Sequence, residues 1–207
     1  MEKCIIITSY IEGTIRELVD ISEKDYIICA DGGYDLAVAE NITPSIVIGD
    51  FDSSNITIPQ GINIVTVPVK KDVTDTALCL DHAAEKGYRH VLIVGGIGGR
   101  LDHTIANIQN IFAYTKQGMS VIMADQGNIV MALINGGTTI PPREGHKLSL
   151  FSHSDLCRGV TVSGAQYPLQ NHTLTAQFPL GVSNEFAGED VTVEVENGEL
   201  LIIMSRD

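Results

Sequence analysis

The chain has 207 residues, of which 44% are hydrophobic, so it is long enough to bury the core of one large domain or two small ones. It carries 26 acidic and 13 basic residues, which give a formal net charge of −13 at pH 7. A field of that sign repels phosphate backbones and anionic lipids, so neither nucleic acid nor a membrane surface is an expected partner. An anionic small molecule would need a divalent cation, or a few well-placed basic and N–H groups, in order to bind.

The cysteines are widely spaced and include no C-x-x-C pair: Cys4, Cys29, Cys79 and Cys157. This usage predicts buried free thiols in a reducing compartment. The N-terminus shows no extended apolar segment, and no window of the sequence reaches the length of a membrane span. We therefore expect a cytoplasmic protein.

Short runs rich in Ile and Val alternate with helical patterns in the first part of the chain, which is typical of parallel strands covered by helices. Strands are expected at residues 3–8, 26–30, 46–48, 62–67, 90–94 and 120–124. Helical spacing occurs at residues 15–20, 34–40, 74–86 and 103–116, with Gly87 and Gly118 as stop signals. These elements predict a three-layer α/β domain with a parallel sheet over residues 1–130.

After about residue 125 the apolar runs become short and alternating. They predict strands at residues 129–134, 147–151, 160–162, 174–178, 191–195 and 200–204. The Asn197-Gly198 pair between the last two runs predicts a type I′ hairpin. Since no helical pattern interrupts this region, we expect a β-sandwich or a small β-barrel, and assign residues 131–207 to an antiparallel β-sandwich.

One apolar strand, residues 46–48, leads through Gly49 into Asp50-Phe51-Asp52. Two aspartates that leave a strand at positions i and i+2 can hold one hard cation through their oxygens. Asp and Ser also favour turns, so this stretch alone leaves a turn and a metal site equally open.

The neighbouring strand ends favour the metal site. In an open parallel sheet, ligands bind outside the carboxyl ends of the strands. Four successive predicted strands end in acids, glycines or both, at residues 31–33, 50–52, 70–75 and 95–103. Scattered surface acids would not gather at one edge in this way.

Residues 95–100 form a glycine-rich connection between a predicted strand and a predicted helix. Glycines let backbone N–H groups approach an anion closely at a helix N-terminus. The segment matches neither the G-x-G-x-x-G fingerprint nor a P-loop. A tight turn with Asp102 as the N-cap would also explain the glycines. It leaves Arg100 unexplained, and a permanent forked cation beside such a loop suits a phosphate.

The segment Asp72-Val73-Thr74-Asp75 has two interpretations that the sequence leaves open. With Asp72 as N-cap and an acid three residues later, it resembles a capping box. Together with Lys70 and Lys71, it also supplies a phosphate-binding cation and a further metal ligand. Asp81 and His82, later in the same helix, are expected on a solvated face.

With these residues assembled, the sequence resembles the thiamine pyrophosphokinase family, whose members transfer a diphosphate from ATP to thiamine and release AMP. Six segments carry the resemblance, in order along most of the chain. They are residues 30–33 (ADGG), 48–53 (IGDFDS), 71–75 (KDVTD), 95–103 (GGIGGRLDH), 166–169 (QYPL) and 181–185 (GVSNE).

The resemblance implies a role for each matching residue. Mg²⁺ would be held by Asp50, Asp52 and Asp75, with Asp31 nearby. The residues expected to handle the ATP phosphates are Lys71, Thr74, Gly95, Gly96, Gly98, Gly99, Arg100, Asp102 and His103. Ser183 and Asn184 would contact the thiamine pyrimidine. The family also implies a homodimer, with each site shared between the α/β domain of one subunit and the β domain of the other.

One departure from the family concerns the aromatic residue near thiamine. Some relatives use a tryptophan there, whereas this chain contains none. Tyr167 is a candidate replacement, although a tyrosine in a strand is also explained by packing.

The expected reaction is an in-line attack of the thiamine hydroxyl on the β-phosphorus of ATP, with AMP as the leaving group. Such a transfer depends on positioning and charge neutralisation, which Mg²⁺, Arg100 and Lys71 would provide. Asp50, Asp52 and Asp75 complete the expected catalytic set, and Asp72 and Asp102 are candidates for the proton acceptor.

Two rival functions remain open at this stage. A D-x-D after a strand also opens the haloacid-dehalogenase pattern, which would make Asp50 the nucleophile of a phosphohydrolase. That family needs a later Lys and paired acids at another α/β strand end, whereas this chain changes to β structure. The other rival is a nucleotide-sensing module without activity, whose β half binds a partner.

Overall fold

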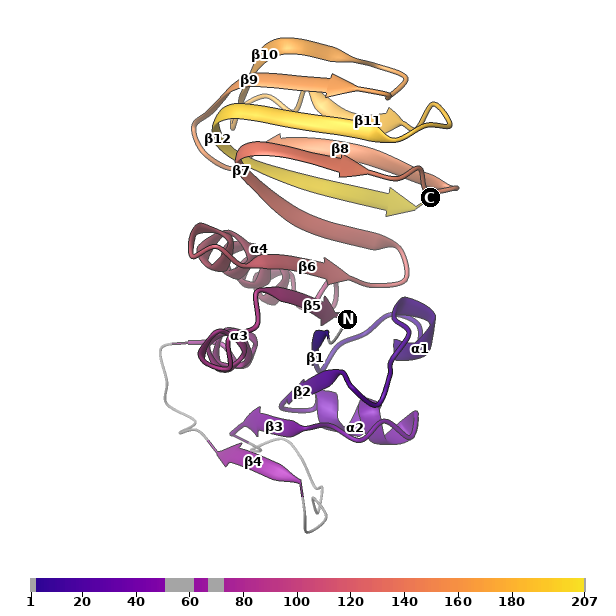
Figure 1. Ribbon diagram of the computed structural model, residues 1–207, viewed down its shortest axis with the longest axis vertical. Helices are drawn as coiled ribbons and strands as arrows, with labels where there is room; N and C mark the ends of the chain where they lie inside the picture. The colour runs from indigo at the N-terminus through magenta and orange to yellow at the C-terminus, as the bar shows by residue number, and fades with distance from the viewer. Residues whose placement is uncertain (1–2, 51–61, 67–72, 207) are drawn as a thin grey trace. The chain divides into compact units, whose positions relative to one another are not determined.

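The computed structural model describes residues 3–50, 62–66 and 73–206, and the chain divides into two compact units. We call Met1–Gln126 the α/β unit and Gly127–Asp207 the β unit. The predicted mixed α/β class is confirmed (Figure 1). The predicted site residues Asp52, Lys71 and Asp72 lie outside the described ranges.

The α/β unit alternates strands and helices along the chain. Its elements are β1 (Cys4–Ile7), α1 (Ile15–Leu18), β2 (Tyr26–Ala30), α2 (Gly33–Ala39), β3 (Ile46–Gly49), β4 (Asn63–Thr66), α3 (Asp75–Glu85), β5 (His90–Val94), α4 (Leu101–Lys116) and β6 (Ser120–Ala124). The strands predicted at residues 26–30, 90–94 and 120–124 are confirmed at those bounds. The predicted bounds of the other strands and helices of this unit differ from the observed bounds by at most about two residues.

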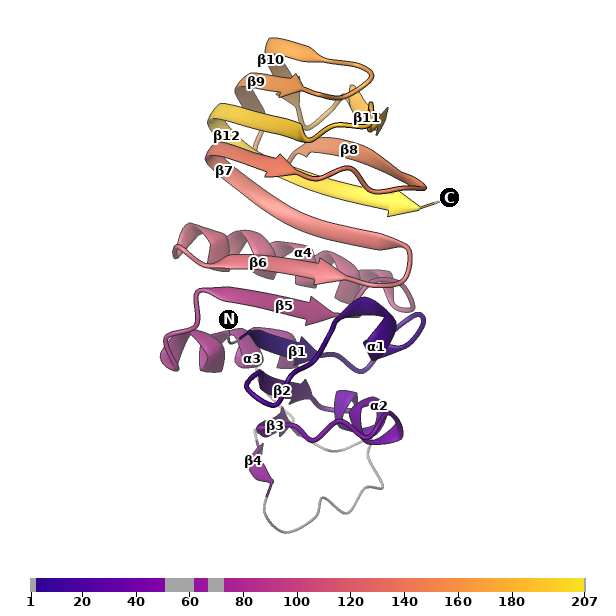
Figure 2. The same cartoon turned by 45° about the vertical axis from the view of Figure 1, so that its right-hand side comes forward.

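All strand pairs of this unit are parallel, and their order in the sheet is β6-β5-β1-β2-β3-β4. Figure 2 shows β6, β5 and β1 side by side with the same direction. Every residue of β1 and β3 is buried, because helices cover both faces of the sheet. Ile5 and Ile7 pack with Ile15 of α1 and Tyr34 of α2. Helices α3 and α4 lie on the opposite side (Figure 1).

Two predicted helix caps in this unit are wrong. Helix α3 begins at Asp75, so its N-cap is Thr74, whose hydroxyl accepts a hydrogen bond from the Ala77 N–H at 3.2 Å. The capping-box interpretation with Asp72 as the N-cap is therefore wrong. Helix α4 begins at Leu101 after Arg100, which makes Asp102 a residue of the first turn and not the N-cap.

The solvated face predicted for Asp81 and His82 is confirmed for Asp81, which is exposed, whereas His82 is partly buried. The Tyr114 hydroxyl of α4 lies 2.7 Å from Asp81 Oδ1 and 2.9 Å from the Ala77 carbonyl oxygen. His82 is partly buried, and its Nε2 lies 3.0 Å from the Tyr26 hydroxyl. Helical spacing alone does not show that neighbouring aromatic side chains reach this surface.

The Tyr114 hydroxyl gives a direct test of how α3 and α4 are joined. We expect Tyr114→Phe to lower the free energy of unfolding by about 0.5–1.5 kcal/mol, because the Ala77 carbonyl and the exposed Asp81 carboxylate lose the hydroxyl donor of a buried side chain. Urea denaturation followed by circular dichroism measures this change. Tyr167→Phe, which removes a hydroxyl from a side chain that is 61% exposed, is the control. Equal midpoints for both variants would contradict the proposed bond.

The cysteines behave as predicted, since all four are free and buried. Burial raises the pKa of the Cys4 and Cys29 thiols to about 12, so both stay protonated at neutral pH. Among the helices that the structure describes, none combines the length and apolarity needed to cross a membrane.

The β unit consists of antiparallel strands, and β12 pairs with three of them. Its elements are β7 (Asn128–Ile140), β8 (His146–Ser152), β9 (Leu156–Ser163), β10 (Leu169–Thr175), β11 (Gly181–Glu185) and β12 (Val191–Arg206). Strand β12 pairs with β7 along both of its halves, with β9 along the first half and with β8 along the second. Strand β10 pairs with β9, and β11 pairs with β8.

The hairpin predicted at Asn197-Gly198 is wrong, because the chain continues through it as one strand. The register with β7 shifts between Val195 and Glu199, which marks a β-bulge. The Gly198 N–H donates to Asn135 Oδ1 at 2.8 Å, which ties the bulge to β7. Asn and Gly tolerate the conformations of a bulge as well as those of a type I′ turn.

Candidate functional site

Two predicted metal ligands follow neighbouring strands at the same edge of the parallel sheet. Asp31 comes directly after β2 and Asp50 directly after β3. The Asp31 N–H donates to the Ile48 carbonyl at 2.9 Å, and Asp31 adopts a left-handed conformation with φ 45°. A Cβ at Gly49 would lie 2.9 Å from the Asp31 Cα. The glycine therefore allows Asp31 to pack beside the end of β3.

Asp75 is the first residue of α3, a helix that packs on β1, β2 and β3. Because α3 follows the parallel strand β4, it begins at the carboxyl edge of the sheet. The Thr74 hydroxyl also accepts a hydrogen bond from Asn110 Nδ2 of α4 at 3.3 Å. Thr74 thus holds the start of α3 against α4, a role that the sequence did not reveal.

The carboxylates at this edge are chemically suited to Mg²⁺, which prefers hard oxygen ligands. Within residues 3–50, 62–66 and 73–206, no three His, Cys, Asp or Glu side chains form a group that could hold a metal ion. Asp52, which the resemblance places in the ligand set, is outside those ranges. Asp31, Asp50 and Asp75 fit the ion by residue type and by their position at the edge.

The order of the strands reverses at β1. Strands β2, β3 and β4 extend to one side of β1, whereas β5 and β6 lie on the other. The connection after β1 leads to α1 on one face of the sheet, and the connection after β5 leads to α4 on the other (Figure 1). Parallel sheets bind their ligands at such a point of reversal.

The glycine-rich connection after β5 is held by its own backbone groups. Gly95, Gly96, Gly98 and Gly99 all have positive φ, of 80°, 78°, 87° and 59°. The Gly95 N–H donates to the Ala124 carbonyl at 2.8 Å, and the Gly96 N–H donates to the Tyr10 carbonyl at 2.8 Å. The Gly98 N–H donates to Thr104 Oγ1 at 3.0 Å. The N–H groups of Gly95, Gly96 and Gly98 therefore stabilise the loop itself.

Arg100, at the end of the loop, is paired with Asp102. The Nη2···Oδ2 distance is 2.6 Å and the Nε···Oδ1 distance is 3.2 Å. Both side chains are well exposed, at 72% and 64%. The hydrogen bond from Arg100 lowers the pKa of the Asp102 carboxyl, and the same bond raises the pKa of Arg100. The exposed His103 donates its backbone N–H to Asp102 Oδ1 at 3.1 Å.

Several residues that shape the loop were missed by the sequence reasoning. Asn107, which is buried, donates from Nδ2 to the Gly96 carbonyl at 3.0 Å. Thr8 Oγ1 donates to either the Val94 or the Tyr10 carbonyl, at 3.0 and 3.1 Å. The spacing of Thr104 and Asn107, three residues apart after a glycine loop, is a signal that could have identified the α4 pair.

In the β unit, the two segments predicted to lie near thiamine are brought together. Ala165 and Phe186 form a β-bridge, and the Gln166 N–H donates to the Glu185 carbonyl at 2.9 Å. The Asn184 amide binds both backbone groups of Tyr167: Oδ1 accepts from its N–H at 3.0 Å and Nδ2 donates to its carbonyl at 2.8 Å. The side chain of Asn184 thus extends the pairing of the two segments.

These segments border two cavities of the β unit. Tyr167 and Asn184 line a cavity of about 220 Å³, together with Leu150, Leu169, Leu180, Gly181 and Val182. A cavity of about 560 Å³ lies between the turn at residues 142–147 and the segment containing Glu185, Phe186 and Gly188.

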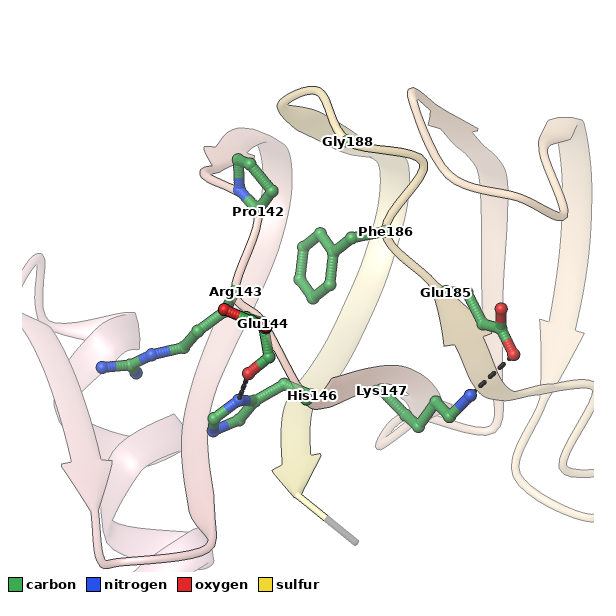
Figure 3. Close-up of a pocket in the computed structure, with 9 residues that line it drawn as sticks. Pro142, Arg143, Glu144, His146, Lys147, Glu185, Phe186 and Gly188 are labelled. Atoms are coloured by element: carbon green, nitrogen blue, oxygen red, sulfur yellow. Dashed lines mark hydrogen bonds and ion pairs between the residues drawn. The ribbon is translucent and has the colours of Figure 1, made fainter.

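The larger cavity contains an aromatic ring that the sequence reasoning missed. Figure 3 shows the Phe186 ring facing this cavity. Lys147 Nζ is paired with Glu185 Oε1 at 2.6 Å, which fixes the wall beside the ring. Ser183, with φ 59°, lies in β11 between the residues of the two cavities, and its N–H donates to Ser149 Oγ at 3.1 Å.

Comparison with known proteins gives a consistent result for both units. The profile described as "Thiamin pyrophosphokinase, catalytic domain" matches residues 19–123, and "Thiamin pyrophosphokinase, vitamin B1 binding domain" matches residues 137–200. A thiamine pyrophosphokinase of Bacillus subtilis (strain 168) is 30% identical over 186 residues, which cover 87% of each chain.

Solved structures are similar over nearly the whole length. The crystal structure of thiamine pyrophosphokinase from Bacillus subtilis gives a TM-score of 0.85 at 28% identity, covering 99% of this chain and 100% of that one. The thiamin pyrophosphokinase structure from Geobacillus thermodenitrificans gives a TM-score of 0.82 at 25% identity, covering 100% and 98%.

Proposed function

The chain belongs to the thiamin pyrophosphokinase family, and we propose that it transfers the diphosphate group of ATP to the hydroxyl of thiamine. The products are thiamine diphosphate and AMP. The observation that supports this proposal is that Asp31, Asp50, Asp75 and Arg100 all follow strands of the parallel sheet at its carboxyl edge. Acids for a cation and an arginine for phosphate are the parts that such a transfer requires.

In the proposed reaction, the thiamine hydroxyl oxygen forms a bond to the β-phosphorus while the bond from that phosphorus to the bridging oxygen of AMP breaks. Arg100 binds the phosphate oxygens, and Lys71 adds a second positive charge. Asp31, Asp50, Asp52 and Asp75 would hold Mg²⁺, which when bound neutralises phosphate charge. Gly95, Gly96, Gly98 and Gly99, with Thr74 and His103, shape the phosphate side of the site.

Asp102 is better suited to positioning Arg100 than to accepting the hydroxyl proton. The hydrogen bond from Arg100 lowers the pKa of the Asp102 carboxyl, and a lower pKa makes it a weaker base. Of the two proton acceptors expected from the sequence, we therefore favour Asp72.

On the thiamine side, we propose Phe186 as an aromatic surface in addition to Tyr167. Its ring faces the larger cavity next to Glu185, and an aromatic ring offers a face on which a planar heterocycle can stack (Figure 3). Ser183 contacts the pyrimidine, as the resemblance implies. Asn184 contributes by fixing the backbone of Tyr167.

The role of Asn184 can be tested by kinetics. We expect Asn184→Ala to raise the KM for thiamine about tenfold, with a smaller change in the KM for ATP, because it releases both backbone groups of Tyr167. Gln170→Ala, which removes an amide from an exposed position of β10, is the control. Equal increases in the two KM values would contradict a role confined to thiamine binding.

The decisive assay follows the products from ATP, thiamine and Mg²⁺ by chromatography. We expect AMP and thiamine diphosphate in equal amounts. Formation of ADP would refute diphosphate transfer, and release of inorganic phosphate without thiamine diphosphate would favour the phosphohydrolase. The antiparallel strands of the β unit offer no further α/β strand end that the hydrolase would need within residues 127–206.

We extend the proposal to the arrangement of the chain. Residues 1–130 act as a three-layer nucleotide- and metal-binding domain, and residues 131–207 act as a β-sandwich that binds thiamine. The protein works in the cytoplasm as a homodimer with sites shared between subunits. Sedimentation equilibrium tests the dimer, since a monomer at assay concentrations would contradict it.

A further inference from the structure

The connection after β1 is tied to the glycine loop after β5 through Tyr10. The Tyr10 carbonyl accepts from the Gly96 N–H at 2.8 Å. The same carbonyl lies so close to Gly95 that a Cβ there would collide with it. Because β1 and β5 are adjacent parallel strands, both connections leave the same edge of the sheet. Tyr10 thus joins the connection after β1 to the connection after β5.

The Tyr10 ring also explains why two loop positions lack side chains. A Cβ at Gly98 would lie 3.1 Å from Tyr10 Cε1, and a Cβ at Gly99 would lie 3.0 Å from Cδ2 and Cε2. Gly87 and Gly118 have similar positive φ values, of 87° and 82°, but a Cβ at either would meet nothing within 4 Å. At Gly87 and Gly118 only the positive φ favours glycine. At Gly98 and Gly99 the absence of a side chain also makes room for the Tyr10 ring.

We propose that Tyr10 is a positioning residue for the reaction, because its ring and carbonyl fix the glycine loop and thereby the place of Arg100. This inference rests on the proposed function. Arg100 follows Gly99 directly, so a displacement of Gly99 moves the guanidinium. A misplacement of about 1 Å in a catalytic group can cost about 10²-fold in rate. The ring is 46% exposed.

A double-mutant cycle between Tyr10 and Gly99 tests the inference. We expect Gly99→Ala and Tyr10→Ala each to raise the KM for ATP about tenfold, with the KM for thiamine changed less than about twofold. The KM for ATP of the double variant should stay near that of Tyr10→Ala, because removal of the ring makes room for the added methyl group. Tyr10→Phe, which keeps the ring, should remain within about twofold of the unsubstituted protein.

The controls separate positioning from folding and from the activity itself. Gly87→Ala adds a methyl at positive φ in open space and should leave both KM values unchanged. The same cycle is measured by calorimetry with a non-hydrolysable ATP analogue, and thermal unfolding midpoints identify variants that fail to fold. If the unsubstituted protein binds the analogue but forms no AMP, diphosphate transfer fails while the cycle still tests Tyr10. The inference is overturned if the double variant raises the KM for ATP by the product of the two single effects, which is about 100-fold.

Discussion

Asp50→Asn should reduce the kcat for thiamine diphosphate formation by about 10²–10³-fold. The substitution preserves the size of the side chain and removes the negative charge that directly follows β3. With one carboxylate fewer beside Asp31, the edge attracts a divalent cation less strongly, so the charge of the phosphates is neutralised less well. Initial rates measured over a series of Mg²⁺ concentrations give both kcat and the apparent affinity for the metal.

The dependence on Mg²⁺ makes this prediction specific. High Mg²⁺ should restore part of the lost rate if Asp50 is a ligand, whereas a loss that is the same at every concentration would argue for another role. Asp20→Asn is the matched control, because this exposed residue lies in the connection between α1 and β2, at the opposite edge of the sheet. Its rate should remain within about twofold of the unsubstituted protein.

Arg100→Ala should lower kcat/KM for ATP by about 10³-fold, since an arginine that stabilises phosphoryl transfer is worth at least that much. The side chain is 72% exposed, so its removal should leave the unfolding midpoint nearly unchanged. Arg100→Lys should recover only part of the activity, because lysine keeps the charge but lacks the planar fork. Steady-state kinetics with ATP varied at saturating thiamine measure both effects.

The partner of Arg100 supplies the control. Asp102→Asn leaves the charge of Arg100 in place and weakens the contacts at 2.6 and 3.2 Å that orient it. We expect a loss of about tenfold, much smaller than that of Arg100→Ala. If Asp102 were the proton acceptor, its loss would equal or exceed that of Arg100, and the acidic limb of the pH–rate profile would disappear.

The sequence predicted the α/β unit well because its signals are local. Buried parallel strands such as β2 and β5 are continuous Ile- and Val-rich runs, and polar or turn-forming residues mark where they end. Helix α3 was located for a similar reason, although the cap considered for it was Asp72, whereas the hydroxyl of Thr74 performs that role. Both side chains suit an N-cap, and only the first residue of the helix decides between them.

The β unit was harder because one local signal fits two structures. Asn197-Gly198 suits a tight turn, but its flanking segments both pair with β7, so the chain does not reverse. Whether Asn197-Gly198 forms a hairpin or continues a strand depends on pairing with β7, which lies far away in the sequence. The two residues themselves do not indicate that pairing. Strand pairing at long range is therefore the information that residue patterns lacked here.

Tyr10 was missed for a related reason. The site was predicted from acids and glycines at four strand ends, whereas the end of β1 carries Thr8, Ser9 and Tyr10. Only the crossover that places β5 beside β1 brings Tyr10 against the glycine loop. The positions of charged residues at the strand ends could thus be predicted from sequence, but the residues that shape the loop required the order of the strands.

The pairing of β12 has a consequence for how the chain is made. During synthesis, the strands of the α/β unit emerge early and find their partners among near neighbours such as β1, β2 and β3. Strand β7 emerges next, but its partner residues from Val191 to Ser205 follow only after β8 to β11. Until then β7 exposes an unpaired edge, which is the condition that favours aggregation. We therefore expect β7 to need protection from aggregation until β12 has been synthesised.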